Sequence, residues 1–100
     1  MEQQTAQSIL KTLDSQRARL RAMGVQRLGL FGSYRRGTAT PESDIDFLVQ
    51  LAHLSFDDYM NLKFFLEDTF GCAVDLVLED SIKPRLRPYI LGEVVYAEGL

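Results

Sequence analysis

The 100-residue sequence has one cysteine, three prolines and no long apolar run. The single cysteine, Cys72, excludes a disulfide within the chain and a thiolate metal cluster, and it fits a reducing compartment. Apolar runs of only a few residues are far too short to cross a membrane, and residues 1–8 contain no apolar signal region. We therefore expect a cytoplasmic protein that has no membrane partner.

Positive charge is also scarce, because 14 acidic residues outnumber 11 Lys and Arg and give a net charge of -3. Proteins that bind the nucleic-acid backbone usually carry a basic excess, so direct nucleic-acid binding is not expected. Nucleoside triphosphates remain suitable ligands, because metal ions can supply the positive charge. The length fits one domain, residues 1–100, with one core and little surface left for a second lobe.

Apolar periodicity divides the chain into alternating helices and strands. The pattern predicts a helix over 5–23, a strand over 25–31, a short segment over 34–40 and a second strand over 44–51. A capping-box pattern at Ser55 then opens a helix that ends at Gly71, and a strand follows over 72–78. A short helix and a short final strand at 94–96 complete an α/β (α+β) fold, with a small mixed sheet flanked by helices.

Carboxylates interrupt two of the predicted strands. Asp44 and Asp46 fall on the same face of their strand, while Ile45 and Phe47 take the opposite face. Asp75 interrupts an otherwise apolar strand. Burying unpaired carboxylates is costly, and neighbouring ones repel, whereas Mg²⁺ prefers such oxygen ligands. Two such ions can stabilise both the attacking and the leaving oxygen of a displacement. Strand positions that simply face water are the alternative for each Asp taken alone.

Gly32 and Ser33 end the first predicted strand and precede the short segment. Glycine lets a phosphate approach the backbone, and a helix starting here presents N–H groups to an anion. A plain strand-to-helix turn capped by Ser33 is the alternative. Arg36 is a candidate for binding phosphate oxygens, whereas an exposed position suits Arg35 better.

These motifs together resemble the signature of the DNA polymerase beta nucleotidyltransferase superfamily. The string GSYRRG at 32–37 is similar to the Gly-Ser-x-Ala-Arg-Gly pattern of that superfamily, although Arg35 replaces the usual small residue. Ten residues separate Ser33 from Asp44, and SDID at 43–46 matches the Ser-Asp-x-Asp form. Asp75 stands where the third carboxylate of the superfamily lies. The tail, KPRLRPYIL at 83–91 and EVVY at 93–96, looks most like minimal nucleotidyltransferases, the MNT proteins.

The resemblance implies a polymerase-beta-type nucleotidyltransferase fold and a role for each motif. Asp44, Asp46 and Asp75 would bind two Mg²⁺ ions, and Asp75 would also help to activate the acceptor hydroxyl. Gly32 and Ser33 would hold the triphosphate of ATP, to which Arg36 would add a charge-assisted contact. Nucleotidyl transfer depends chiefly on positioning and charge stabilisation, so a small site suffices.

The resemblance also implies a partner, because many MNT proteins are encoded beside a HEPN ribonuclease toxin and act as its antitoxin. Such MNT proteins transfer AMP from ATP to a tyrosine of the toxin. Relatives that modify small molecules generally carry an extra helical domain, for which this chain has no room, so a protein acceptor is expected. Two alternatives stay open: a non-catalytic antitoxin that neutralises its partner by binding, and nucleotidyl transfer to RNA or to a small molecule.

Overall fold

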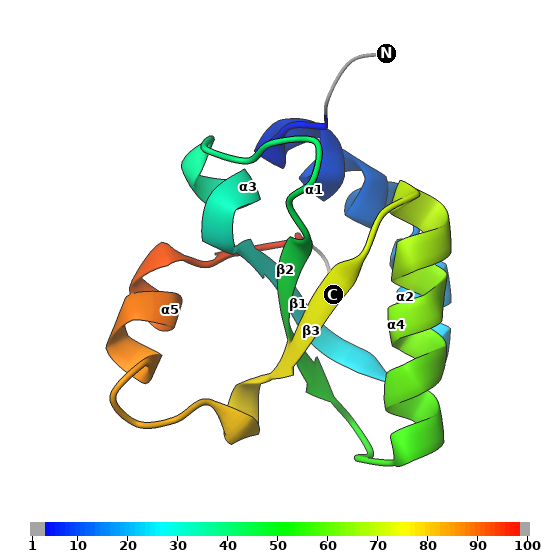
Figure 1. Cartoon of the computed structure of the whole chain (residues 1–100). Helices are drawn as coiled ribbons and strands as arrows, with labels where there is room; N and C mark the ends of the chain where they lie inside the picture. The colour runs from blue at the N-terminus through cyan, green and yellow to red at the C-terminus, as the bar shows by residue number, and fades with distance from the viewer. Residues whose placement is uncertain (1–3, 99–100) are drawn as a thin grey trace.

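The computed structural model describes residues 4–98 and contains a four-stranded sheet with helices packed around it (Figure 1). This arrangement confirms the predicted α/β fold with a small mixed sheet. The elements are, in chain order, α1 (Ala6–Ser15), α2 (Arg17–Ala22), β1 (Val25–Phe31), α3 (Gly32–Arg36), β2 (Ile45–Leu51), α4 (Phe56–Phe70), β3 (Val74–Leu78), the 3₁₀ helix η1 (Glu79–Ser81), α5 (Arg87–Glu93) and β4 (Val95–Tyr96).

The strands lie in the order β3-β2-β1-β4. β1 pairs antiparallel with both β2 and β4, whereas β2 and β3 run parallel. A parallel pair needs a crossover connection, and α4 provides it. Helices α2 and α4 lie on one side of the sheet and α5 lies on the other (Figure 1). The two sides of the sheet therefore differ in what covers them.

The predicted N-terminal helix is interrupted at Gln16, so the structure has two helices where the sequence predicted one. Ser15 and Thr12 offer a physical reason. The Ser15 hydroxyl donates to the carbonyl of Thr12 at 2.7 Å, and the Thr12 hydroxyl donates to the carbonyl of Ser8 at 2.9 Å. Such bonds from side chain to backbone bend helices. Ile9 and Leu13 of the first helix and Leu20 of the second are all buried.

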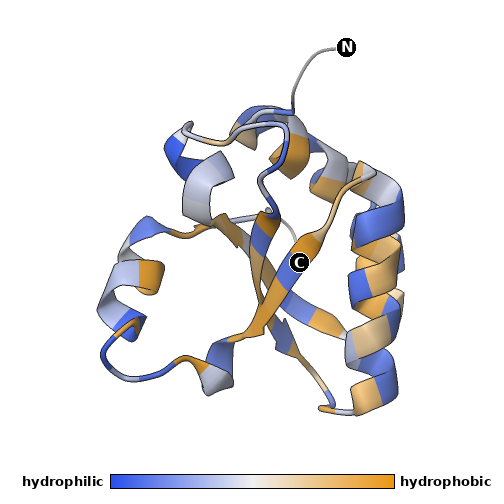
Figure 2. Ribbon diagram, viewed as in Figure 1, coloured by the Kyte–Doolittle hydropathy of each residue, from blue (hydrophilic) through white to orange (hydrophobic). Residues whose placement is uncertain are grey.

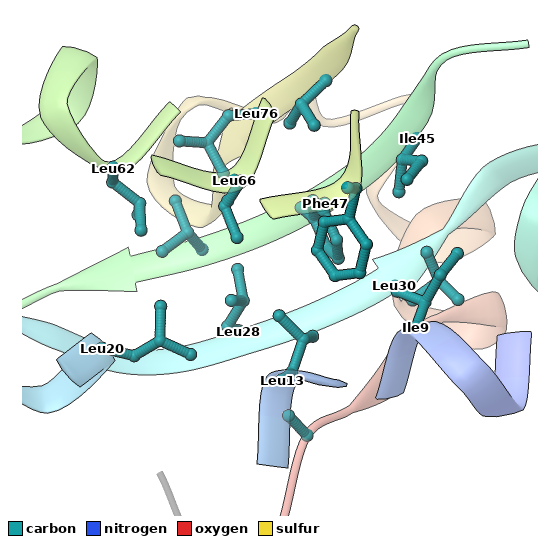
Figure 3. Close-up of a cluster of buried hydrophobic side chains, with 14 of the residues drawn as sticks. Ile9, Leu13, Leu20, Leu28, Leu30, Ile45, Phe47, Leu62, Leu66 and Leu76 are labelled. Carbon is teal, nitrogen blue, oxygen red and sulfur yellow. The ribbon is translucent and has the colours of Figure 1, made fainter. Parts of the chain in front are cut away.

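The core lies between the sheet and helices α1, α2 and α4 (Figure 3). Ile45, Phe47 and Val49 of β2 are fully buried, as their alternation predicted. Burying a large apolar side chain contributes about 1.5–3 kcal/mol. The helices contribute the buried residues Ile9, Leu13, Leu20, Leu62, Leu66 and Phe70. Because β2 side chains alternate, this packing directs Asp46 to the opposite face of the sheet.

Helix α4 begins and ends where its sequence signals predicted. The hydroxyl of its N-cap, Ser55, accepts a hydrogen bond from the Asp58 N–H at 3.1 Å, and Gly71 ends the helix with φ +69°. Apolar residues alternate with hydrophilic ones around this helix (Figure 2). Two of its aromatic rings, Phe56 and Phe64, are largely exposed. The helix therefore has more aromatic residues than its core face holds.

The third strand begins at Val74, two residues later than predicted, so Cys72 lies before the strand and is partly buried. Burial, together with the charges of Asp44 and Glu67, raises the pKa of the Cys72 thiol. A thiol that is harder to deprotonate is a poor nucleophile, which agrees with a structural role. In residues 4–98, no helix is both long enough and apolar enough to span a membrane.

Candidate active site

Two of the three predicted carboxylates lie side by side on neighbouring strands. Asp46 of β2 is the register partner of Asp75 in the parallel strand β3. Register partners on adjacent strands point to the same face of a sheet, so the two side chains project together. Asp46 is partly buried and Asp75 is exposed. The pair therefore combines a sheltered carboxylate with one that is open to solvent.

The environment of Asp46 disfavours its negative charge. Burial, then the charges of Asp75 and Asp44, raises the pKa of Asp46 to about 6, although Arg36 acts in the opposite direction. Asp44 is exposed and lies directly before β2, two residues from Asp46. The three predicted carboxylates therefore interact electrostatically with one another, and their repulsion disfavours the ionised form of Asp46.

The donor chemistry of this cluster suits a hard divalent cation. Within residues 4–98, no three His, Cys, Asp or Glu side chains form a site that would hold a metal by themselves. Mg²⁺, however, is usually held by one or two carboxylates together with substrate phosphates and water. The Asp46–Asp75 pair meets that requirement and Asp44 adds a nearby charge. A bound cation would also relieve the repulsion at Asp46.

Gly32 allows the turn that is predicted to bind phosphate to approach this cluster of carboxylates closely. It follows β1, whose last residue, Phe31, is the register partner of Asp46. Its φ is +77°, in the region that glycine adopts readily, and a Cβ atom added here would lie 2.0 Å from Oδ2 of Asp46. Only a residue without a side chain fits between the backbone and this carboxylate.

The short helix α3 positions Ser33 and Arg36 beside Gly32. Tyr34, which is buried, anchors the helix in the core, and Gly37 ends it with φ +78°. Ser33 is partly buried and Arg36 is exposed. The sequence motif therefore forms a tight turn between β1 and α3, with Ser33 in its first turn.

Glu93, at the end of α5, binds two of the groups predicted to hold phosphate. Its carboxylate accepts hydrogen bonds from the Gly32 N–H at 2.8 Å and from Nη1 of Arg36 at 2.7 Å. Its carbonyl also accepts a bond from Nε of Arg35 at 2.9 Å. Arg35 is exposed, as the sequence predicted, and this hydrogen bond joins it to the end of α5. Arg36 has five N–H donors, so it can contact Glu93 and an anion at once.

A cavity of about 460 Å³ opens beside Gly32 and Asp46. Its walls come from β1, α3, β2 and α5, and are formed by Phe31, Gly32, Arg36, Asp46, Tyr89, Ile90 and Glu93. Three of the six predicted site residues, Gly32, Arg36 and Asp46, thus face one cavity, whereas Ser33, Asp44 and Asp75 are not among the residues that line it. The sequence did not single out Glu93 and Tyr89 because no local pattern links α5 to the motifs.

The sequence pattern of the nucleotidyltransferase domain family matches residues 10–97 of this chain. The chain belongs to this family. The protein adenylyltransferase MntA of Thermococcus cleftensis is 38% identical over 94 residues, which cover 92% of this chain and 95% of that protein. The predicted family is therefore confirmed.

Solved nucleotidyltransferase structures share the fold. A structure described as a minimal nucleotidyltransferase has a TM-score of 0.80 and 30% identity, and the match covers 95% of this chain and 98% of that one. A chain from a toxin–antitoxin complex with AMP-PNP has a TM-score of 0.70 and 28% identity, with 87% and 73% covered. The polymerase-beta-type fold expected from the sequence is confirmed.

In this nucleotidyltransferase we expect Glu93→Gln to destabilise the fold by about 0.5–1 kcal/mol at pH 7. Burial of Glu93 raises its pKa, but the hydrogen bonds from Arg36 and Gly32 and the charges of Arg36 and Arg35 lower it below 4.5 overall. The stabilisation is therefore present above pH 4.5 and is lost as the pH falls through the lowered pKa. Urea unfolding of the wild type and the variant at pH 7 and pH 3 measures the difference in their free energies of unfolding.

The exposed Glu42→Gln variant is the matched control for Glu93→Gln. It should change the free energy of unfolding little at either pH. An effect of Glu93→Gln as large at pH 3 as at pH 7 would show that packing, and not charge, accounts for the contribution of Glu93.

Proposed function

We propose that this protein transfers AMP from ATP to a hydroxyl, a tyrosine hydroxyl by resemblance, of a partner HEPN ribonuclease toxin and so acts as its antitoxin. The observation that carries the proposal is the Asp46–Asp75 pair across two parallel strands, with Gly32 directly beside Asp46. In a nucleotidyltransferase chain, this arrangement gathers acidic ligands and a phosphate-binding turn in one place. The relatives add support, because one is named a protein adenylyltransferase and another belongs to a toxin–antitoxin complex with AMP-PNP.

Each predicted site residue has a role in this proposal. Asp44, Asp46 and Asp75 hold two Mg²⁺ ions, while Gly32, Ser33 and Arg36 hold the triphosphate of ATP. The ions, when bound, supply the positive charge that the -3 chain lacks near the phosphates. The raised pKa of Asp46 supports metal binding there, because a cation offsets both causes of the rise, which are burial and then repulsion by Asp75 and Asp44.

The transfer itself needs little from the protein beyond positioning. The acceptor oxygen attacks the α-phosphorus of ATP, the bond from that phosphorus to the bridging oxygen breaks, and pyrophosphate leaves. Asp75 is exposed, so its carboxylate can meet an acceptor that enters from solvent and take the hydroxyl proton. Arg36 stabilises the charge that develops on the phosphate oxygens. We also propose a cytoplasmic location, where ATP is available.

The test is to incubate the purified chain with its HEPN partner, ATP and Mg²⁺ and to record the intact masses of both proteins. The Asp44→Ala/Asp46→Ala double variant serves as control. We expect the partner to gain one or more AMP units with the wild-type chain and none with the variant. A stable complex without any mass gain would overturn the catalytic proposal and favour neutralisation by binding. A gain on RNA or on a small molecule would instead redirect the search for the acceptor.

A further inference from the structure

Within residues 4–98, Tyr89 differs from the other three tyrosines because it is neither buried nor held by a hydrogen bond or a cation–ring contact. Tyr34 is buried, Tyr59 donates its hydroxyl hydrogen to the carbonyl of Leu76, and the Tyr96 ring lies 4.4 Å from the Arg27 guanidinium carbon. Tyr89 is 77% exposed, the highest exposed fraction among the large apolar and aromatic side chains described. Tyr89 also lines the cavity beside Gly32 and Asp46, so its ring can contact a ligand bound there.

Helix α5 holds this ring beside the predicted phosphate site. Tyr89 and Glu93 are four residues apart in α5, so they lie on the same helix face, with Cβ atoms about 5–6 Å apart. The Glu93 carboxylate accepts the Gly32 N–H at 2.8 Å. Tyr89 is therefore about one helical turn along α5 from the residue that contacts the turn proposed to hold the triphosphate, and Tyr89 and Gly32 line the same cavity.

The cavity at this place is lined by two chemically different kinds of residue. Gly32, Arg36, Asp46 and Glu93 offer polar or charged groups. Phe31, Tyr89 and Ile90 offer apolar or aromatic surface. A nucleotide needs both kinds of surface, because it has charged phosphates and a flat base. Sites for small molecules commonly combine apolar walls with a few polar groups that fix orientation.

We propose that Tyr89 is the platform on which the base of the bound nucleoside triphosphate stacks. The inference rests on the proposed function, because it requires the triphosphate at Gly32 and Ser33. Stacking of a base on an aromatic ring needs no hydrogen bond, so the ring and not the hydroxyl of Tyr89 carries the effect. The platform adds affinity for a nucleoside triphosphate beyond the affinity for its phosphates.

Calorimetric titrations of the full chain with ATP and with inorganic tripolyphosphate, both with Mg²⁺, test the platform. We expect Tyr89→Ala to weaken ATP binding about tenfold, as loss of one stacked base predicts, and to leave tripolyphosphate binding unchanged. Tyr89→Phe should bind ATP like the wild type. Phe64→Ala, which removes another exposed ring on α4, is the matched control and should change neither affinity.

The outcomes separate this inference from the proposed function. Equal ATP affinity in Tyr89→Ala and wild type, or equal loss of both ligands, would overturn the platform while the proposed function stands. An ATP affinity as low in Tyr89→Phe as in Tyr89→Ala would assign the effect to the hydroxyl and also overturn it. Failure of the wild type to bind either ligand would overturn both proposals. Unfolding curves show whether Tyr89→Ala is folded, as its exposed position predicts.

Discussion

Asp46→Asn is expected to slow AMP transfer strongly and, at the same time, to raise the free energy of unfolding of the metal-free protein. If Asp46 binds Mg²⁺ as proposed, replacing its carboxylate with an amide removes a ligand for the cation and should lower the transfer rate by about a hundred- to a thousandfold. The same change removes a negative charge that burial, Asp75 and Asp44 all disfavour. Activity and stability should therefore move in opposite directions.

The pH dependence of this stabilisation follows from the pKa of Asp46. The folded-state pKa is about 6 and the ordinary value is 3.8, so the folded protein binds the proton more tightly than the unfolded chain does. Ionised Asp46 thus destabilises the fold increasingly between pH 4 and pH 6, and fully above pH 6. Asp46→Asn should gain about 1–2 kcal/mol at pH 8, after allowance for solvent screening, and almost nothing below pH 4.

Urea unfolding in the presence of a chelator at pH 4 and pH 8 measures the gain, and intact mass of the toxin partner measures the transfer. Asp68→Asn, which removes an exposed charge from α4, is the control and should leave both nearly unchanged. A variant at position 46 that is inactive and also less stable at pH 8 would contradict the repulsion described for this cluster.

Gly32→Ala should lose both stability and transfer activity. The added Cβ would lie 2.0 Å from Oδ2 of Asp46, and φ is +77°, so the backbone is strained as well. We expect a loss of about 2–4 kcal/mol in the free energy of unfolding, since steric overlap adds to the conformational cost. Transfer should fall by at least about tenfold, because displacement of the Asp46 carboxylate disturbs the proposed metal site.

Gly37→Ala is a close control, because it separates backbone strain from steric overlap. Gly37 has nearly the same φ, +78°, but a Cβ added there meets no atom within 4 Å. Gly37→Ala should therefore lower the free energy of unfolding only by the cost of the left-handed conformation, about 1–2 kcal/mol. It should retain AMP transfer. Equal losses in the two variants would show that the contact between Gly32 and Asp46 contributes nothing.

The elements that the sequence predicted best are those whose signals are local. β1 has the predicted bounds, and α4 ends at the predicted glycine. Asp44 and Asp46 are two residues apart in the sequence, so their proximity is local, although β2 begins at Ile45, one residue later than predicted, and Asp44 lies just outside the strand. The pairing of Asp46 with Asp75 comes from the parallel register of β2 and β3, which was not predicted; the resemblance indicated only that Asp75 stands where the third carboxylate lies.

The parts that the sequence could not predict depend on contacts between distant segments. Glu93 is 61 residues from Gly32 and 57 from Arg36, and no spacing rule connects them. Tyr89 likewise reaches the cavity only because α5 folds back over the sheet. The interruption at Gln16 arises from hydroxyl bonds to the backbone, which apolar periodicity does not detect.

The alternation of β2 and β3 ties the geometry of the site to the cohesion of the core. A slip of one residue in either strand would turn its carboxylate into the apolar interior and bring an apolar residue such as Phe47 or Leu76 to the surface. Such a shift would carry the cost of burying a charge and of exposing apolar area together. The energy that holds the two strands in register therefore also sets the spacing of the two carboxylates, so no dedicated scaffold is needed to maintain it.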